Sequence, residues 1–219
     1  LAVLGRPSEA NVRLAGIEAA IAGETSVWPR RNLMSHQLLV HLENGELGAS
    51  VDELIARYDA LGDNPRWAAF HSKHAYVFKA YVRLAQASDV PSPGATAALR
   101  EALRQLDHAS GGHPTLRSHY LTVRGALRRI EHRHAESLRD LAEAEVLAQE
   151  ADSPWALFEI RRHSAQTLAA MGNREAALRQ ARVAHRLAVE HGWVNRARWL
   201  RKDFETLQAP PVAAFAPLI

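Results

Sequence analysis

Small apolar residues repeat along one face of the segment 173–190. Ala177, Ala181, Ala184 and Ala188 follow one another at steps of four, three and four residues, and most positions between them are charged or polar. This spacing predicts an amphipathic helix. Because alanine on the buried face lets another helix backbone come close, we expect this helix to pack tightly between neighbours.

The same pattern recurs 40 residues upstream. Two helices share it position by position, with Leu138, Leu141, Ala144, Leu147 and Ala148 matching Leu178, Ala181, Ala184, Leu187 and Ala188. The preceding helices match at Pro114 with Pro154 and at Gly125 with Ala165. Weaker copies contain Ala98, Leu99, Ala102 and Leu106, and then Leu54, Ile55, Tyr58 and Leu61. A fixed period near 40 residues is typical of a helical repeat array.

Apolar periodicity and its breaks predict ten helices and no sheet. Capping residues followed by proline, as in Asn64-Pro65 and Ser153-Pro154, mark helix starts. The predicted helices cover residues 8–22, 29–43, 50–61, 65–87, 94–108, 114–132, 134–150, 154–171, 173–190 and 193–206. We therefore predict an all-α solenoid of antiparallel helix pairs. It forms a single helical-repeat domain over 1–207, with weaker repeats over 28–93 and clearer ones over 94–207. The tail 208–219 is broken by prolines and is expected to be irregular.

The segment 153–192 resembles a tetratricopeptide repeat (TPR). Its first helix has Ala165 at the family's small position, its turn is Gly172-Asn173, and its second helix has Ala177 and Ala184 at small positions. The family's aromatic and leucine positions in the first helix hold Arg161, Ser164 and Leu168, and the period is 40 residues instead of about 34. The chain thus resembles the longer, degenerate TPR-like arrays of large bacterial signalling and regulatory proteins, either signalling ATPases of the STAND class or kinase-associated proteins.

This resemblance implies a concave face, built mainly from the first helix of each pair, that binds a partner. Carrying over the family's groove positions gives a partner-binding set of His119, Thr122, Arg129, Glu159, Arg162 and Gln166. An arginine-containing groove suits an acidic peptide, because guanidinium forms paired hydrogen bonds with carboxylates. The alternative is a solvated face that binds nothing strongly.

Charge and composition narrow the class of partner. The net charge is +3, and all but three of the 27 basic residues are arginine, but 24 acidic residues are interspersed with them. Without a clustered basic patch, nucleic-acid binding is not expected. No apolar run reaches membrane-spanning length. The absence of cysteine fits a reducing compartment, so we expect a cytoplasmic protein. The first residue is Leu1, and we expect the chain to be part of a longer protein.

No catalytic, metal or cofactor motif stands out. The chain has 12 histidines, but the pairs His71/His74 and His132/His134 lack a third ligand nearby, and there is no phosphate-binding loop or nucleophile motif. We therefore expect neither an enzyme nor a cofactor. Tryptophans near helix starts, Trp67, Trp155 and Trp193, are expected to wedge adjacent repeats together; alternatively, one tryptophan is an anchor in a binding groove.

Together these patterns predict a non-catalytic domain that recognises a protein or peptide, which could be another domain of the same parent chain. A small-molecule sensor that holds an effector inside the superhelix is the alternative. A deep pocket with converging polar groups would favour the sensor, and a shallow open groove would favour peptide recognition.

Overall fold

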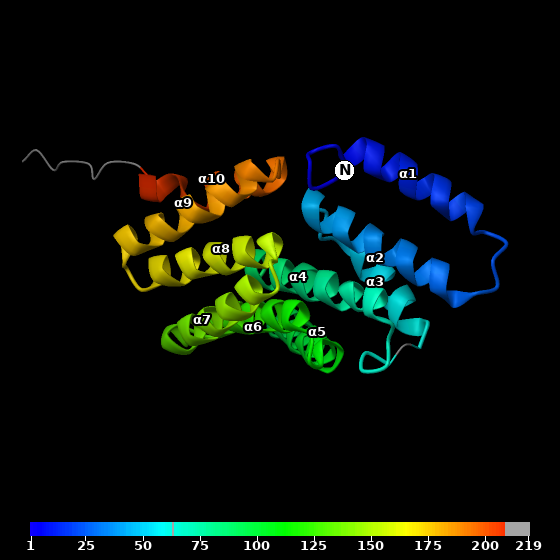
Figure 1. Ribbon diagram of the computed structural model, residues 1–219, viewed down its shortest axis with the longest axis horizontal. Coiled ribbons are helices and arrows are strands. Elements are labelled where there is room, and N and C mark those ends of the chain that lie inside the picture. Colours follow the sequence, from blue (N-terminus) through cyan, green and yellow to red (C-terminus); the bar gives the residue numbers. More distant parts are fainter. Residues whose placement is uncertain (63, 209–219) are drawn as a thin grey trace, which may run out of the picture.

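The computed structural model describes residues 1–62 and 64–208, and this part of the chain is all-α, as predicted (Figure 1). It contains ten α-helices, one 3₁₀ turn and no strand. The helices are α1 (Pro7–Ala20), α2 (Val27–Asn44), α3 (Ala49–Ala60), α4 (His74–Asp89), α5 (Pro93–Ser110), α6 (Pro114–Ile130), α7 (His134–Glu150), α8 (Pro154–Ala170), α9 (Arg174–Glu190) and α10 (Val194–Gln208), with η1 (Phe70–Lys73) before α4.

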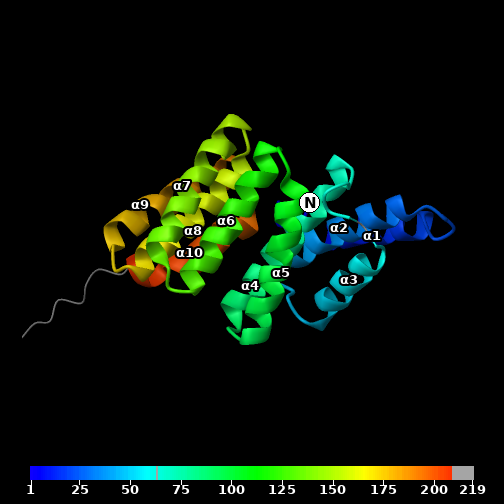
Figure 2. The ribbon, with the colours of Figure 1, turned by 90° about the horizontal axis from the view of Figure 1, so that it is seen from below.

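Helices that follow one another in the chain mostly pack against each other, an arrangement that fits a solenoid. The even-numbered helices make a second set of contacts, since α2 packs on α4, α4 on α6 and α6 on α8. They therefore form an inner row, while α3, α5, α7 and α9 lie outside it. Figure 2 shows α6 to α10 gathered at one side of the molecule and α1 to α3 at the other, with α4 and α5 between them.

The C-terminal half is built from helices of equal length joined by turns of the same kind. Helices α6, α7, α8 and α9 are each 17 residues long. The turn after each of them holds one residue with positive φ, and these residues are His132, Asp152, Gly172 and Gly192. The next residue donates its N–H back to a carbonyl of the last helical turn, as Asn173 does to Leu168 at 2.9 Å. Equal helices and equal turns give the 40-residue period of the sequence.

The alanine face of α9 is buried, as its spacing predicted. Ala177, Ala184 and Ala188 are at most 1% exposed and Ala181 is 7% exposed. In α7 the residues 40 positions earlier have the same burial along the whole matched stripe. Helices α6 and α7 also approach closely, because a Cβ added to Gly125 would lie 3.1 Å from the carbonyl oxygen of Ser137. Small residues therefore set the helix spacing in this half.

The predicted helix 65–87 begins too early. Asn64 does start a turn, with its side chain accepting a hydrogen bond from the N–H of Arg66 at 3.0 Å. The chain then becomes extended at Ala69, and α4 follows only after η1. Trp67 is 77% exposed, so this turn has little apolar contact that could extend it into a helix. By contrast, α4 buries residues on all its sides.

The end of the chain was predicted as an irregular tail over 208–219. Helix α10 still includes Gln208, and residues 209–219 lie outside the described part. None of the described helices combines the length and the apolar character that crossing a lipid bilayer requires.

Replacing Ala184 with leucine tests the close packing of α9. Ala184 is fully buried between α8 and α10 residues, so three additional carbons should force neighbouring side chains apart and cost about 1–3 kcal/mol. Val189→Leu is the matched control, because Val189 lies on the same helix and is 60% exposed. Urea unfolding of both variants measures the difference. Equal midpoints for Ala184→Leu and wild type would mean that this face is not packed.

Candidate functional site

Helix α10 is attached to α2 by a buried arginine. Arg196 is 2% exposed, and its Nε donates to Oε1 of Glu43 at 2.9 Å. Its Nη1 lies 3.3 Å from Oε1 of Glu159 on α8. The neighbouring Asn195 donates to the carbonyl oxygen of Glu43 at 3.0 Å and to that of Ala2 at 3.3 Å. We call Glu43, Arg196 and Glu159 the ion triad; it joins residues about 150 positions apart in the sequence.

Aromatic rings enclose the guanidinium of the triad. The centroids of Trp155, Phe158, Trp193 and Trp199 lie 5.0 to 5.9 Å from the Arg196 guanidinium carbon. Ring faces attract a cation, and the attraction grows when water is excluded. The same burial raises the pKa of Glu43, although the charge of Arg196 opposes this rise. The triad therefore lies in a dry aromatic setting where each charge needs its partners.

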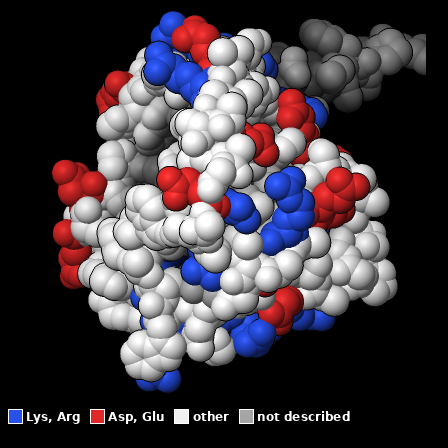
Figure 3. Space-filling view, turned by 90° about the vertical axis from the view of Figure 1, so that its right-hand side faces the viewer, with Lys and Arg blue, Asp and Glu red and all other residues white. Residues whose placement is uncertain are grey.

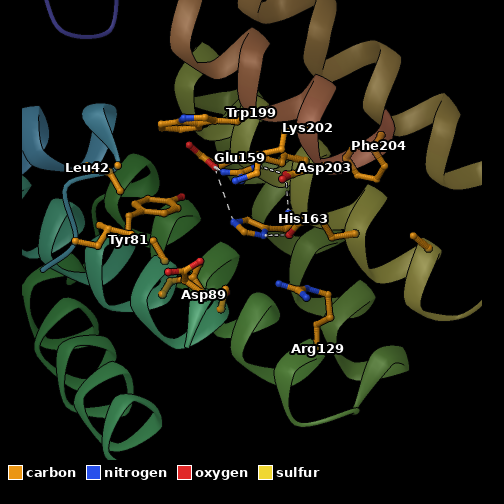
Figure 4. A pocket seen from close by; sticks show the side chains of 18 residues that line it. Leu42, Tyr81, Asp89, Arg129, Glu159, His163, Trp199, Lys202, Asp203 and Phe204 are labelled. Atoms are coloured by element: carbon orange, nitrogen blue, oxygen red, sulfur yellow. Dashed lines mark hydrogen bonds and ion pairs between the residues drawn. The ribbon is translucent and has the colours of Figure 1, made fainter. Parts of the chain in front are cut away.

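Beside the triad, the inner helices enclose a cleft of about 620 Å³ (Figure 4). Its walls come from the end of α2 and the loop after it, from α4, from the end of α6, and from α8 and α10. The apolar wall includes Leu42, Leu47, Leu84 and Ala85, and the polar wall includes Arg129, Glu159, Arg162, His163, Gln166 and Asp203. We call this space the central cleft; its volume lies within the roughly 300–1,000 Å³ of ordinary ligand sites.

Hydrogen bonds in the cleft fix the protonated nitrogen of His163. Asp203 accepts hydrogen bonds from Gln166 Nε2 and from Arg162 Nε, both at 2.9 Å. Since the Gln166 amide nitrogen faces Asp203, its oxygen faces His163 Nδ1 at 3.0 Å and accepts the hydrogen there. Burial and the nearby guanidinium of Arg162 lower the pKa of His163 well below its usual value. The ring is therefore neutral, and its Nε2 carries a lone pair.

Two buried nitrogen atoms of the residues that line the cleft have no hydrogen-bond partner among the described residues. One is His163 Nε2, which lies 3.8 Å from Oε2 of Glu159, another acceptor. The other is Nε of Arg129, whose guanidinium forms no ion pair with any described carboxylate. Burial and the charge of Arg162 lower the pKa of Arg129, although the charge of Asp203 opposes this fall. An unpaired donor and an unpaired acceptor therefore line one cleft, a costly arrangement unless something else binds them.

Four of the six predicted groove residues line the cleft: Arg129, Glu159, Arg162 and Gln166. His119 and Thr122 do not, since they are 1% and 0% exposed. His119 is hydrogen-bonded to the Tyr81 hydroxyl at 3.0 Å and contacts the ring of Trp155, so α4 and α8 cover this part of α6. Only the last turn of α6 opens into the cleft, and that turn carries Arg129.

Arg162 also differs from the free groove arginine that the sequence predicted. It pairs with Asp203 on α10 and lies over the ring of Trp199 at 5.2 Å. Its side chain is 20% exposed. Arg162 therefore links α8 to α10 in addition to lining the cleft.

The repeat register did not point to His163, Asp203 or the pair Glu43–Arg196. His163 could have been found, because it follows Glu159 by four residues and precedes Gln166 by three, which places all three on one helix face. Asp203 and Glu43 come from distant segments and had no signal in the repeat register. Among the described residues, no three His, Asp or Glu side chains are placed to hold a metal ion.

The tryptophans have different roles. Trp155 packs between α4 and α6 side chains, and Trp193 packs edge-on against Phe158, so both act as the predicted wedges. Trp67 is 77% exposed and wedges nothing. Trp199 lines the central cleft.

Removing the carboxylate of Glu43 should destabilise the fold strongly. The side chain is fully buried, and its loss deprives Arg196 of its closest partner, which typically costs about 3–5 kcal/mol. Glu175→Ala is the control, since Glu175 also pairs with an arginine but is 87% exposed, and exposed pairs contribute about 0–1 kcal/mol. Urea unfolding compares the two. Similar losses for both variants would contradict a special role for the triad.

Two buried histidines should make stability depend on pH. Burial lowers the pKa of His119 to about 3, and the pKa of His163 is also well below 6.5. The unfolded chain therefore binds protons that the folded chain does not. The free energy of unfolding should fall as pH drops below about 6.5, by about 1.4 kcal/mol per pH unit for each histidine. His119→Gln should reduce this slope by one histidine's share in urea titrations at about pH 7, 6 and 5. An unchanged slope would show that His119 is protonated in the folded state.

Comparisons with known proteins give no relative of this chain. Neither the known family models, nor the curated proteins, nor the solved structures include a match to this chain.

Proposed function

We propose that this chain is the non-catalytic recognition domain of a larger bacterial signalling or regulatory protein, that its fold is TPR-like, and that it binds a compact polar ligand in the central cleft. The observation that carries the proposal is the convergence of polar side chains from α6, α8 and α10 on one cleft, opposite an apolar wall from α2 and α4. Sites for small ligands commonly combine apolar walls with a few converging polar groups.

The geometry supports a compact ligand better than an extended acidic peptide. An extended peptide would run along the inner face of α6 and α8, but His119 and Thr122 on that face are buried. Arg162, its expected anchor, already pairs with Asp203. The contact between α10 and α2 also bounds the cleft beside the ion triad. The small-molecule alternative from the sequence therefore becomes the preferred hypothesis.

A binding role also fits the state of the polar groups better than catalysis. The neutral ring of His163 forms its hydrogen bond with an amide, and no described hydroxyl is hydrogen-bonded to the ring as an activated nucleophile would be. Basic and acidic residues are interspersed on the face shown in Figure 3, which gives no support to the nucleic-acid alternative.

Filling the cleft tests the proposal. Ala169 lines the cleft, whereas the next residue, Ala170, is exposed and does not. The purified domain, Ala169→Trp and Ala170→Trp are each dialysed against the small-molecule fraction of a bacterial lysate, and retained compounds are identified by mass spectrometry. Wild type and Ala170→Trp should retain the same compound. Ala169→Trp should retain at most about a tenth of that amount.

Three results would contradict the proposal. Equal retention by both tryptophan variants would place binding outside the cleft. Retention of acidic peptides alone would return the peptide hypothesis to first place. No retention by wild type would argue against a small-molecule site. Circular dichroism of both variants checks that the fold is kept.

A further inference from the structure

We infer that the central cleft binds a small α-amino acid with an apolar side chain. This inference rests on the proposed function and names the ligand class for the same site. In this arrangement the ligand's ammonium group donates to His163 Nε2 and Glu159 Oε2, its carboxylate pairs with Arg129, and its side chain contacts the apolar wall. Each part follows from an unsatisfied group or a surface of the cleft.

The ammonium position is set by two hydrogen-bond acceptors, His163 Nε2 and Glu159 Oε2, which face one another. His163 is 5% exposed, and the relay from Asp203 through Gln166 holds its proton on Nδ1. Its Nε2 lone pair therefore points toward Oε2 of Glu159 at 3.8 Å, and Nε2 has no hydrogen-bond donor among the described residues. Nη1 of Arg162 lies 3.9 Å from that oxygen, which is too far for a hydrogen bond. Two acceptors at this distance repel each other unless a shared donor bridges them. A protonated amine supplies several N–H donors and a positive charge beside the carboxylate.

The carboxylate position is set by Arg129. Its Nε is buried without a partner, and Figure 4 shows the side chain reaching from α6 into the same part of the cleft as His163. A guanidinium that is partly buried and unpaired is a strong site for a carboxylate, which it can hold by two parallel hydrogen bonds. Arg162 is less suited to this role, because Asp203 already occupies its Nε.

Asp89 and the apolar wall of the cleft favour a ligand with one ammonium group and an apolar side chain. Asp89 lies in the cleft across from Arg129 and forms no ion pair with a described residue (Figure 4). Its negative charge disfavours a second carboxylate on this side of the cleft, whereas Lys202 lines the α10 side. Leu42 and Leu84 form the wall beyond it and are largely buried. Burying an aliphatic side chain there favours binding, because it removes apolar surface from water.

Four probes of nearly equal shape test the inference with the purified domain. L-Leucine has both charged groups. The probe 2-hydroxyisocaproate replaces the amine by a hydroxyl, 4-methylpentanoate lacks the amine, and 3-methylbutylamine lacks the acid. Calorimetric titration should give the tightest binding for leucine, about tenfold weaker binding for the hydroxy acid, and about a hundredfold weaker binding for the last two probes. In protein labelled with ¹⁵N-histidine, leucine should also move the Nε2 resonance of His163.

Two variants assign the two ends of the ligand. His163→Phe should abolish the preference for leucine over 4-methylpentanoate, because the acceptor nitrogen is lost. Arg129→Met should abolish the preference for leucine over 3-methylbutylamine. Arg186→Met is the control, since Arg186 lies on α9 with a side chain that is 69% exposed, and it should bind all four probes like wild type. Thermal unfolding by circular dichroism checks that each variant is folded.

Several outcomes would overturn the inference. Equal binding of leucine and 4-methylpentanoate would remove the ammonium site. A His163 Nε2 resonance that no probe moves would mean that water alone satisfies this atom. If no probe binds while the cleft-filling variant still loses a compound retained by wild type, the ligand class is wrong and the proposed function stands. If the wild type retains nothing either, both proposals fail.

Discussion

The guanidinium of Arg196 holds together parts of the chain that lie far apart in sequence. It bonds Glu43 at the end of α2 and Glu159 on α8, in a setting enclosed by four aromatic rings. Removing three charges from water costs several kcal/mol each, so the triad stabilises the fold only through the ion pairs between its members. Replacing the charged side chains by apolar groups of similar size often leaves the free energy of unfolding unchanged. The role of the ion triad is instead to specify where α10 docks.

That docking position explains why the central cleft exists. In a helical stack held only by neighbouring repeats, the last helix would contact its predecessor and leave the inner row open. Here α10 also contacts α2, and its other turns bring Trp199, Lys202 and Asp203 over the inner faces of α8 and α6. The carboxylate of Asp203 then orders Arg162 and Gln166, and through Gln166 it selects the tautomer of His163. The contact between α10 and α2 thus determines the hydrogen-bonding pattern of the cleft.

Local rules and long-range contacts act on different parts of the molecule. From α6 to α9, equal helices, small residues at the crossings and turns with one left-handed residue repeat every 20 positions. This half was predictable in detail, including the buried faces of α7 and α9. The half before it lacks that regularity. The capping side chain of Asn64 and the proline after it predicted a helix start. Helix α4 begins ten residues later, because the run of residues that are buried on all sides of the helix starts there.

The sequence by itself determined the all-α class, the 40-residue unit, the alanine faces and the inward orientation of Arg129, Glu159, Arg162 and Gln166. These features depend on residues within one or two helices, whose spacing is visible in the chain. Only the tertiary structure decided that His119 and Thr122 are covered, that Arg162 is paired, and that His163 faces the cleft with a bare lone pair. Those outcomes depend on Tyr81, Glu43 and Asp203, which come from other helices. Contacts between distant segments have no period in the sequence, because they are fixed by how far the whole stack curves before α10 meets α2.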